Sequence, residues 1–151
     1  NACGCLQITD FYKIIIIESM KDYYSTIRGF LQNLELEIKH ENQKEGIFIV
    51  SNESEGIFHL IICVAHPIVI FEQFIFEIKQ EGNLVYKSLL QKNRDIIHGA
   101  FVLDDSGKKV IFRDSLQIEN LNQNEFEATL NSLSVLLSEY SEQIINFSKN
   151  N

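Results

Sequence analysis

The chain is poor in the residues that cross-link, kink or rigidify small proteins. Its 151 residues include three cysteines, one proline, one methionine and no tryptophan. Three is an odd number of cysteines, and Cys63 lies inside an apolar run, so we expect reduced thiols in a cytoplasmic protein rather than a disulfide framework. A domain of this length buries about 68–70% of the surface of its unfolded chain, so a core can form without metals or disulfides. The composition therefore indicates one globular domain.

Basic residues are also few, because 13 lysines and arginines stand against 21 aspartates and glutamates, for a formal net charge of −8. Binding to nucleic acid or to an anionic membrane surface needs basic patches, so we expect neither partner. The sequence has no run of about 18 or more apolar residues, the length that a transmembrane helix needs. The apolar run Ile14–Ile17 is too short for the core of a signal peptide.

Motifs of catalysis and metal binding are missing as well. The histidines are His40, His59, His66 and His98, and they form neither an H-E-x-x-H pattern nor a zinc-type set with a cysteine pair. Cys3 and Cys5 offer two soft ligands that do not close a metal site, so we interpret them as part of a tail. The segment Asp104–Lys109 has the spacing of neither a P-loop nor a calcium loop, and its Gly107 suits a hairpin turn. We therefore predict no catalytic, cofactor-binding or metal-binding residue, and no enzyme.

Apolar periodicity, by contrast, is abundant. Two segments repeat apolar residues in steps of four and three, which is the spacing of one face of a helix. They are Met20–Leu34 and Asn122–Ser148, and Asn122 is placed to cap the second. At 1.5 Å per residue the second would be roughly 40 Å long, enough to cover a whole sheet. A third helix is predicted over Glu81–Ile97, with Leu84 and Leu89 facing inward.

Strand patterns fill the rest of the chain. The predicted strands are Glu35–Lys39, Gly46–Ser51, Gly56–Val64, Pro67–Lys79, Gly99–Leu103 and Val110–Arg113. Runs of strands between helices, without alternating βαβ units, indicate an α+β fold with an antiparallel sheet. We predict the order α-β-β-β(-β)-α-β-β-α, with about five or six strands packed by helices. Residues 20–151 would form this single domain, and residues 1–19 an N-terminal extension that is either a tail or an extra strand.

Two of the predicted strands, Gly56–Val64 and Pro67–Lys79, are apolar on both faces. An antiparallel sheet with one face in water should alternate apolar and polar residues instead. We therefore expect both faces at the centre of the sheet to be covered, one by helices and the other by the N-terminal segment, a second subunit or a client protein. The candidate partner or dimer surface consists of Ile68, Ile70, Phe71, Phe74 and Phe76.

Between Leu89 and Asp104 the chain resembles the YbjN-like family, which belongs with the type III secretion chaperone-like proteins of the Tir chaperone group. Members have a helix that ends in a leucine pair and an asparagine, a strand that ends in aspartate, a glycine turn, a second strand and a long final helix. The matching residues here are Leu89, Leu90, Asn93, Phe101, Leu103, Asp104, Gly107, Val110, Phe112 and the stripe from Phe126 to Ile144. The order of elements matches from Met20 to Ser148.

The resemblance implies a small acidic α+β protein of the cytoplasm, commonly a homodimer. Secretion chaperones of this group hold an extended segment of a client against apolar surface patches, whereas YbjN-like members are described as regulators. The first hypothesis is therefore a chaperone-like homodimer that shields an apolar or extended segment of a partner protein. The second is a regulatory or structural dimer without a client. The third, a small-ligand binder or enzyme, lacks the convergent polar groups that such a site needs.

Overall fold

A computed structural model describes residues 22–79 and 83–149 of the chain. Its elements are a helix that includes residues 22–33, β1 (Glu37–Asn42), β2 (Ile47–Asn52), the 3-10 turn η1 (Glu53–Glu55), β3 (Ile57–Ala65), β4 (Ile68–Glu77), α2 (Asn83–Asn93), β5 (Ala100–Leu103), β6 (Lys109–Gln117) and α3 (Gln123–Lys149). The six strands form one antiparallel sheet in the order β1-β2-β3-β4-β6-β5. The predicted α+β class and element order are thus confirmed. The predicted extension over residues 1–19 lies outside the described residues.

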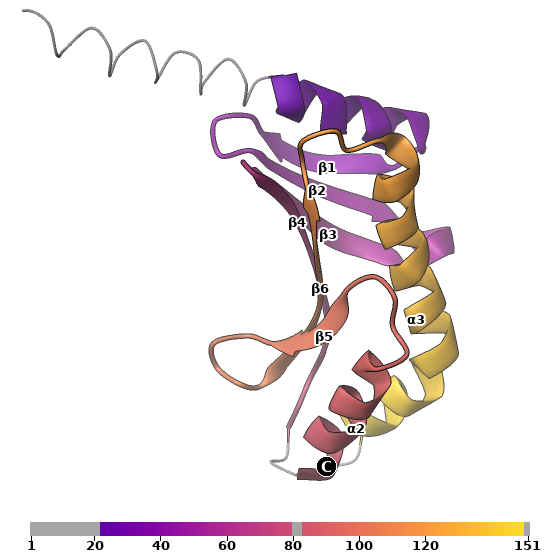
Figure 1. Cartoon of the computed structure of the whole chain (residues 1–151). Coiled ribbons are helices and arrows are strands. Elements are labelled where there is room, and N and C mark those ends of the chain that lie inside the picture. Colours follow the sequence, from indigo (N-terminus) through magenta and orange to yellow (C-terminus); the bar gives the residue numbers. More distant parts are fainter. Residues whose placement is uncertain (1–21, 80–82, 150–151) are drawn as a thin grey trace, which may run out of the picture.

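The first helix, α2 and α3 all lie on one side of the sheet, with α3 running along the molecule (Figure 1). Phenylalanines join the layers, because the buried Phe126 of α3 packs against the buried Phe71 of β4 and the partly buried Phe30 of the first helix, with ring centroids 5.1 and 5.6 Å apart. The cap of α3 is confirmed, since the Glu125 backbone N–H donates to Asn122 Oδ1 at 3.0 Å. The long apolar stripe of α3 therefore closes the core over one face of the sheet.

Helix α2 is shorter than predicted and ends at Asn93 rather than at residue 97. The Asn93 side chain accepts a hydrogen bond from the Phe101 backbone N–H at 2.8 Å and donates one to the Phe101 carbonyl at 3.0 Å. This side chain thus acts as a strand partner for β5, and residues 94–99 form the connection. The prediction for Leu84 is also wrong, because that side chain is exposed, whereas Leu89 is buried as predicted.

Irregular pairing in β3 and β4 decides which side chains face the helices. His59 has a left-handed φ of 49°, and the pairing of β2 with β3 shifts between Val50 and Asn52. The pairing of β4 with β6 shifts between Phe74 and Phe76. Each shift inserts one extra residue into a strand and reverses the alternation of faces beyond it. The faces that simple alternation predicts are therefore wrong on one side of each bulge.

Two buried polar side chains hold the bulge in β3. The His59 backbone N–H donates to Ser51 Oγ at 3.1 Å. Gln73 Oε1 accepts from the Phe58 backbone N–H at 2.9 Å, and Gln73 Nε2 donates to the Gly56 carbonyl at 3.1 Å. These bonds replace the ladder bonds that a bulge disrupts, which explains why β4 carries a buried glutamine among apolar residues.

The connection between β5 and β6 is the predicted hairpin turn. The Gly107 backbone N–H donates to the Asp104 carbonyl at 2.9 Å, and Gly107 has a positive φ of 70°. Asp104 Oδ1 accepts from the Ser106 hydroxyl at 2.7 Å and from the Lys109 backbone N–H at 3.1 Å. These hydrogen bonds lower the pKa of the Asp104 carboxyl. The loop is thus a structural turn built around one carboxylate.

Candidate protein-binding surfaces

The face of the sheet opposite the helices carries a continuous set of apolar side chains, which we call the open face. It consists of Ile47, Ile49, Ile61, Cys63, Ile70, Phe74, Val102 and Ile111. Antiparallel pairing lines these residues up across neighbouring strands as Ile47–Cys63–Ile70, Ile49–Ile61 and Phe74–Ile111–Val102. Among the helices that the structure describes, none lies over this face (Figure 1).

Several side chains of the open face reach far into solvent. Phe74 is 55% exposed and Ile61 is 41% exposed, although both lie in central strands of the sheet. Phe58, which the bulge in β3 turns outward, is exposed as well. Scattered exposed apolar residues are normal on a protein surface, but a contiguous set on adjacent strands is typical of an interaction site.

One ion pair interrupts the apolar rows. Glu72 of β4 lies opposite Ile61 on one side and opposite Arg113 of β6 on the other. The Arg113 guanidinium donates to the Glu72 carboxylate. Because both side chains are partly exposed, the pair adds little stability. It does place a donor and an acceptor in the middle of the apolar surface, where they can orient a bound segment.

The five residues of the predicted partner surface are divided between the two faces of β4. Ile70 and Phe74 lie on the open face, and Ile68 lies on the same side at the start of the strand, opposite Gln117 of β6. Phe71 is fully buried and Phe76 is nearly so. For these two the prediction is corrected: Phe71 belongs to the core, and the bulge before Phe76 turns that ring toward the helices.

A second apolar surface lies at the β5 edge of the sheet, and we call it the leucine edge. It surrounds a hollow of about 340 Å³ between α2 and β5, lined by Tyr86, Leu89, Leu90, Phe101, Val102 and Leu103. Leu90 is 71% exposed, and Leu103, which lines the same hollow, is exposed as well. The backbone of β5 is not open at Phe101, because Asn93 already occupies its outward N–H and C=O groups. Side chains rather than strand pairing therefore define this edge.

Sequence reasoning found only part of these surfaces. Ile61, Ile111 and Val102 were assigned to strands but not to a partner surface. The signal for Ile61 is the missing polar alternation, which runs through β2, β3 and β4 and indicates an apolar outer face; Ile111 and Val102 lie outside these strands, in β6 and β5.

Within residues 22–79 and 83–149, no group of three or more histidine, cysteine, aspartate or glutamate side chains is arranged to hold a metal ion. In the same residues, no helix is both long and apolar enough to cross a membrane.

Three solved structures share the fold. The E. coli protein YbjN superposes with a TM-score of 0.61 at 16% sequence identity, over 79% of this chain and 91% of that chain. A chain of the HopA1–SchA chaperone–effector complex gives a TM-score of 0.61 at 13% identity, over 81% and 95% of the two chains. The type III secretion chaperone SycH of Yersinia pestis, solved with a stable fragment of YscM2, gives 0.50 at 17% identity, over 83% and 99%. No curated protein matches the chain.

The family model CesT_Tir_1 matches residues 20–150, which include every helix and strand that the structure describes. The resemblance to YbjN-like and secretion chaperone-like proteins is thus confirmed. Because the match covers most of its length, the chain belongs to the CesT_Tir_1 family.

Proposed function

We propose that the protein is a non-enzymatic, chaperone-like binding module that shields an apolar, extended segment of a partner protein. The observation that carries this proposal is the open face, where Phe74 and Ile61 stand in solvent on central strands. Covering a large apolar side chain is worth about 1.5–3 kcal/mol, so a segment that covers several of them gains enough to offset its own ordering.

The neighbouring folds support a protein rather than a small molecule as the partner. SchA was solved in a chaperone–effector complex, and SycH was solved with a fragment of YscM2. The open face is a broad surface instead of an enclosed pocket, which suits a polypeptide more than a compact ligand. Its Glu72–Arg113 pair offers polar groups to a main chain that crosses the sheet.

We test the shielding role with reduced insulin, whose B chain aggregates through apolar segments as it is released. The wild-type protein should suppress the light scattering of the aggregating chain. Phe74→Asp and Ile61→Asp should lose most of this suppression, because each places a charge on the open face. Ile145→Asp is the matched control, since Ile145 is a similarly exposed apolar residue on α3. Circular dichroism verifies that each variant is folded. Equal suppression by all three variants would exclude the open face as the shielding surface.

We also propose that the protein is a homodimer and that the leucine edge forms its interface. The support is the exposure of Leu90 and Leu103 around one hollow at the end of the sheet. Leu90→Asp should convert the dimer to monomer in light scattering coupled to size-exclusion chromatography, whereas Phe74→Asp should leave the dimer intact. If Phe74→Asp alone dissociates it, the open face is the dimer contact instead, and the protein is then a dimer without a client site there.

A further inference from the structure

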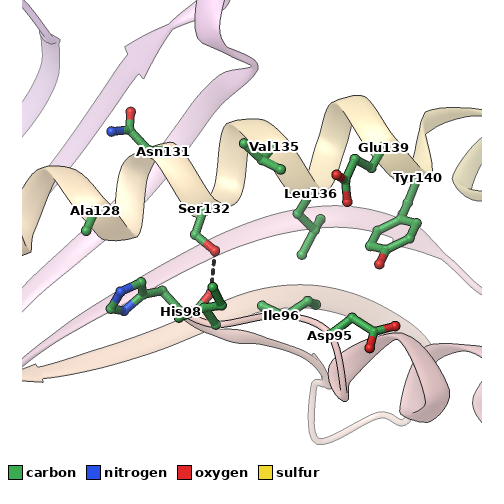
Figure 2. A pocket seen from close by; sticks show the side chains of 11 residues that line it. Asp95, Ile96, His98, Ala128, Asn131, Ser132, Val135, Leu136, Glu139 and Tyr140 are labelled. Atoms are coloured by element: carbon green, nitrogen blue, oxygen red, sulfur yellow. Dashed lines mark hydrogen bonds between the residues drawn. The ribbon is translucent and has the colours of Figure 1, made fainter.

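A third surface lies on the helical side of the molecule, where the connection between α2 and β5 faces the long helix α3. The groove between them has a volume of about 380 Å³. Ile96 of the connection and Leu136 of α3 face each other across it (Figure 2), and its lining also includes Val135 and Ile97. Ile97 is 89% exposed, the highest value among the large apolar residues that the structure describes.

Hydrogen bonds and packing fix the wall that carries Ile96 and Ile97. The Ser132 hydroxyl of α3 donates to the His98 carbonyl at 2.7 Å (Figure 2). Next to it, Gly99 has a positive φ of 79° and packs so tightly that a Cβ there would lie 2.4 Å from Cε2 of Phe112. At the start of the connection, the Asn93 side chain is hydrogen-bonded to the backbone of Phe101 in β5. The groove is therefore preformed, which lowers the entropic cost of filling it.

One end of the groove is acidic. Asp95 from the connection and Glu139 from α3 lie on either side of Tyr140 (Figure 2). Burial raises the pKa of the Tyr140 hydroxyl, and the carboxylates of Glu139 and Asp95 raise it further. Lys92 also approaches this end, since its Nζ lies 4.0 Å from the centre of the Tyr140 ring. The lining of the groove includes the carboxylates of Asp95 and Glu139 and no lysine or arginine, so this end of the groove is negative.

We propose that this groove binds a segment of a partner protein that presents an aliphatic side chain next to a lysine or arginine. The aliphatic side chain would cover Ile96, Leu136 and Val135, and the basic group would lie at the end of the groove that Asp95 and Glu139 line. The proposal extends the proposed function to a second contact surface, and it rests on that function only for the partner being a protein. An acidic segment is excluded by the charge of the rim.

The test uses two fluorescein-labelled peptides, one of alternating leucine and lysine and the other of alternating leucine and glutamate. Fluorescence anisotropy should show that the wild-type protein binds the lysine peptide at least about tenfold more tightly. Glu139→Lys should remove this preference. Glu127→Lys is the matched control, because it changes the same charge on α3 outside the groove, about 18 Å along the helix from Glu139, and should alter the affinity less than about twofold.

Equal effects of the two charge reversals would overturn the proposal, because they would show attraction to the net negative charge alone. A second readout is the set of backbone amide shifts in the NMR spectrum on adding the lysine peptide. Shifts at Ile97, Ser132 and Glu139 are expected, and shifts confined to Ile61 and Phe74 would also overturn it. Phe74→Asp should retain the peptide preference, so a failure of the groove and a failure of the open face are told apart.

Discussion

The two faces of the central sheet carry similar residue types, but only one face has a partner within the described chain. On the helical side Phe71 packs against Phe126 and is fully buried. On the other side Phe74, three residues further along the same strand, is more than half exposed. Full burial of such a ring contributes about 1.5–3 kcal/mol to the free energy of folding, and the isolated chain lacks most of this contribution at Phe74. This difference is the basis for the proposal that the open face contacts another molecule.

The two edge strands of the sheet are a second place where a partner could bind, by pairing with an edge as an additional strand. At one edge, β1 carries charged residues, among them Lys39 and Glu37, which form an ion pair of 2.6 Å. At the other edge, Asn93 occupies the outward backbone groups of β5 at Phe101. Charged side chains and covered backbone groups both discourage strand addition. A bound segment is therefore expected to lie over the open face rather than to extend the sheet.

The largest expected effect comes from truncating the two phenylalanines of β4 in parallel. Phe71→Ala should lower the free energy of unfolding by about 3–5 kcal/mol, because it leaves a cavity under α3. Phe74→Ala should change it by less than about 1 kcal/mol, because its ring is largely in water. Denaturant titrations measure the free energy of unfolding of both variants, and their m-values should equal that of the wild type. Similar losses for the two variants would mean that the open face is covered within the chain itself.

A second pair compares glycines that differ in what surrounds them. Gly99→Ala should cost about 2–4 kcal/mol, because its positive φ and the close Phe112 ring both resist a methyl group. Gly107→Ala should cost only about 1–2 kcal/mol, since its φ is also positive but no atom lies within 4 Å of the added Cβ. Thermal unfolding of the two variants gives the ranking. If Gly107→Ala were the more damaging, the tight packing of the wall beside the Figure 2 groove would be refuted.

The sequence predicts the elements well because each leaves a periodic or capping signal. Asn122 caps α3 as expected, and the hairpin at Gly107 forms where its turn residues lie. The bulges escape prediction, since a strand that is apolar on both faces shows no pattern from which an inserted residue can be seen. Simple alternation along β4 therefore puts Phe76 on the same face as Phe74, which the bulge between them makes wrong. Gln73 was the available signal, because a buried glutamine in an apolar strand indicates broken backbone pairing nearby.

The groove and the leucine edge were beyond prediction for a different reason. Both depend on where α2 stops, and the stop is set by the contact of Asn93 with a strand that follows later in the chain. Local periodicity continues through Ile96 and therefore favours a longer helix. Only the tertiary contact separates Leu90, which remains on the helix, from Ile97, which becomes part of the groove.

The smallest expected effect concerns the hairpin loop, which belongs to neither face. The pKa of Asp104 is lowered in the folded protein by the hydrogen bonds from Ser106 and the Lys109 backbone. The carboxylate therefore contributes stability that is fully present above its usual pKa of 3.8 and is lost as the pH falls through the lower folded value. Asp104→Asn should remove the loss of stability that comes from protonating this carboxylate. The free energies of unfolding of wild type and variant should therefore converge as the pH falls below 3.8.

Asp105→Asn is the control, because it removes a charge from the same loop and leaves the hydrogen bonds of Asp104 in place. Denaturant titrations at a series of acidic pH values follow the three proteins. A difference between wild type and Asp104→Asn that stays constant with pH would show that the carboxylate has no special role in the turn. Binding to the open face should be unchanged in both variants, because the loop is stabilised by its own hydrogen bonds and contributes no side chain to that surface.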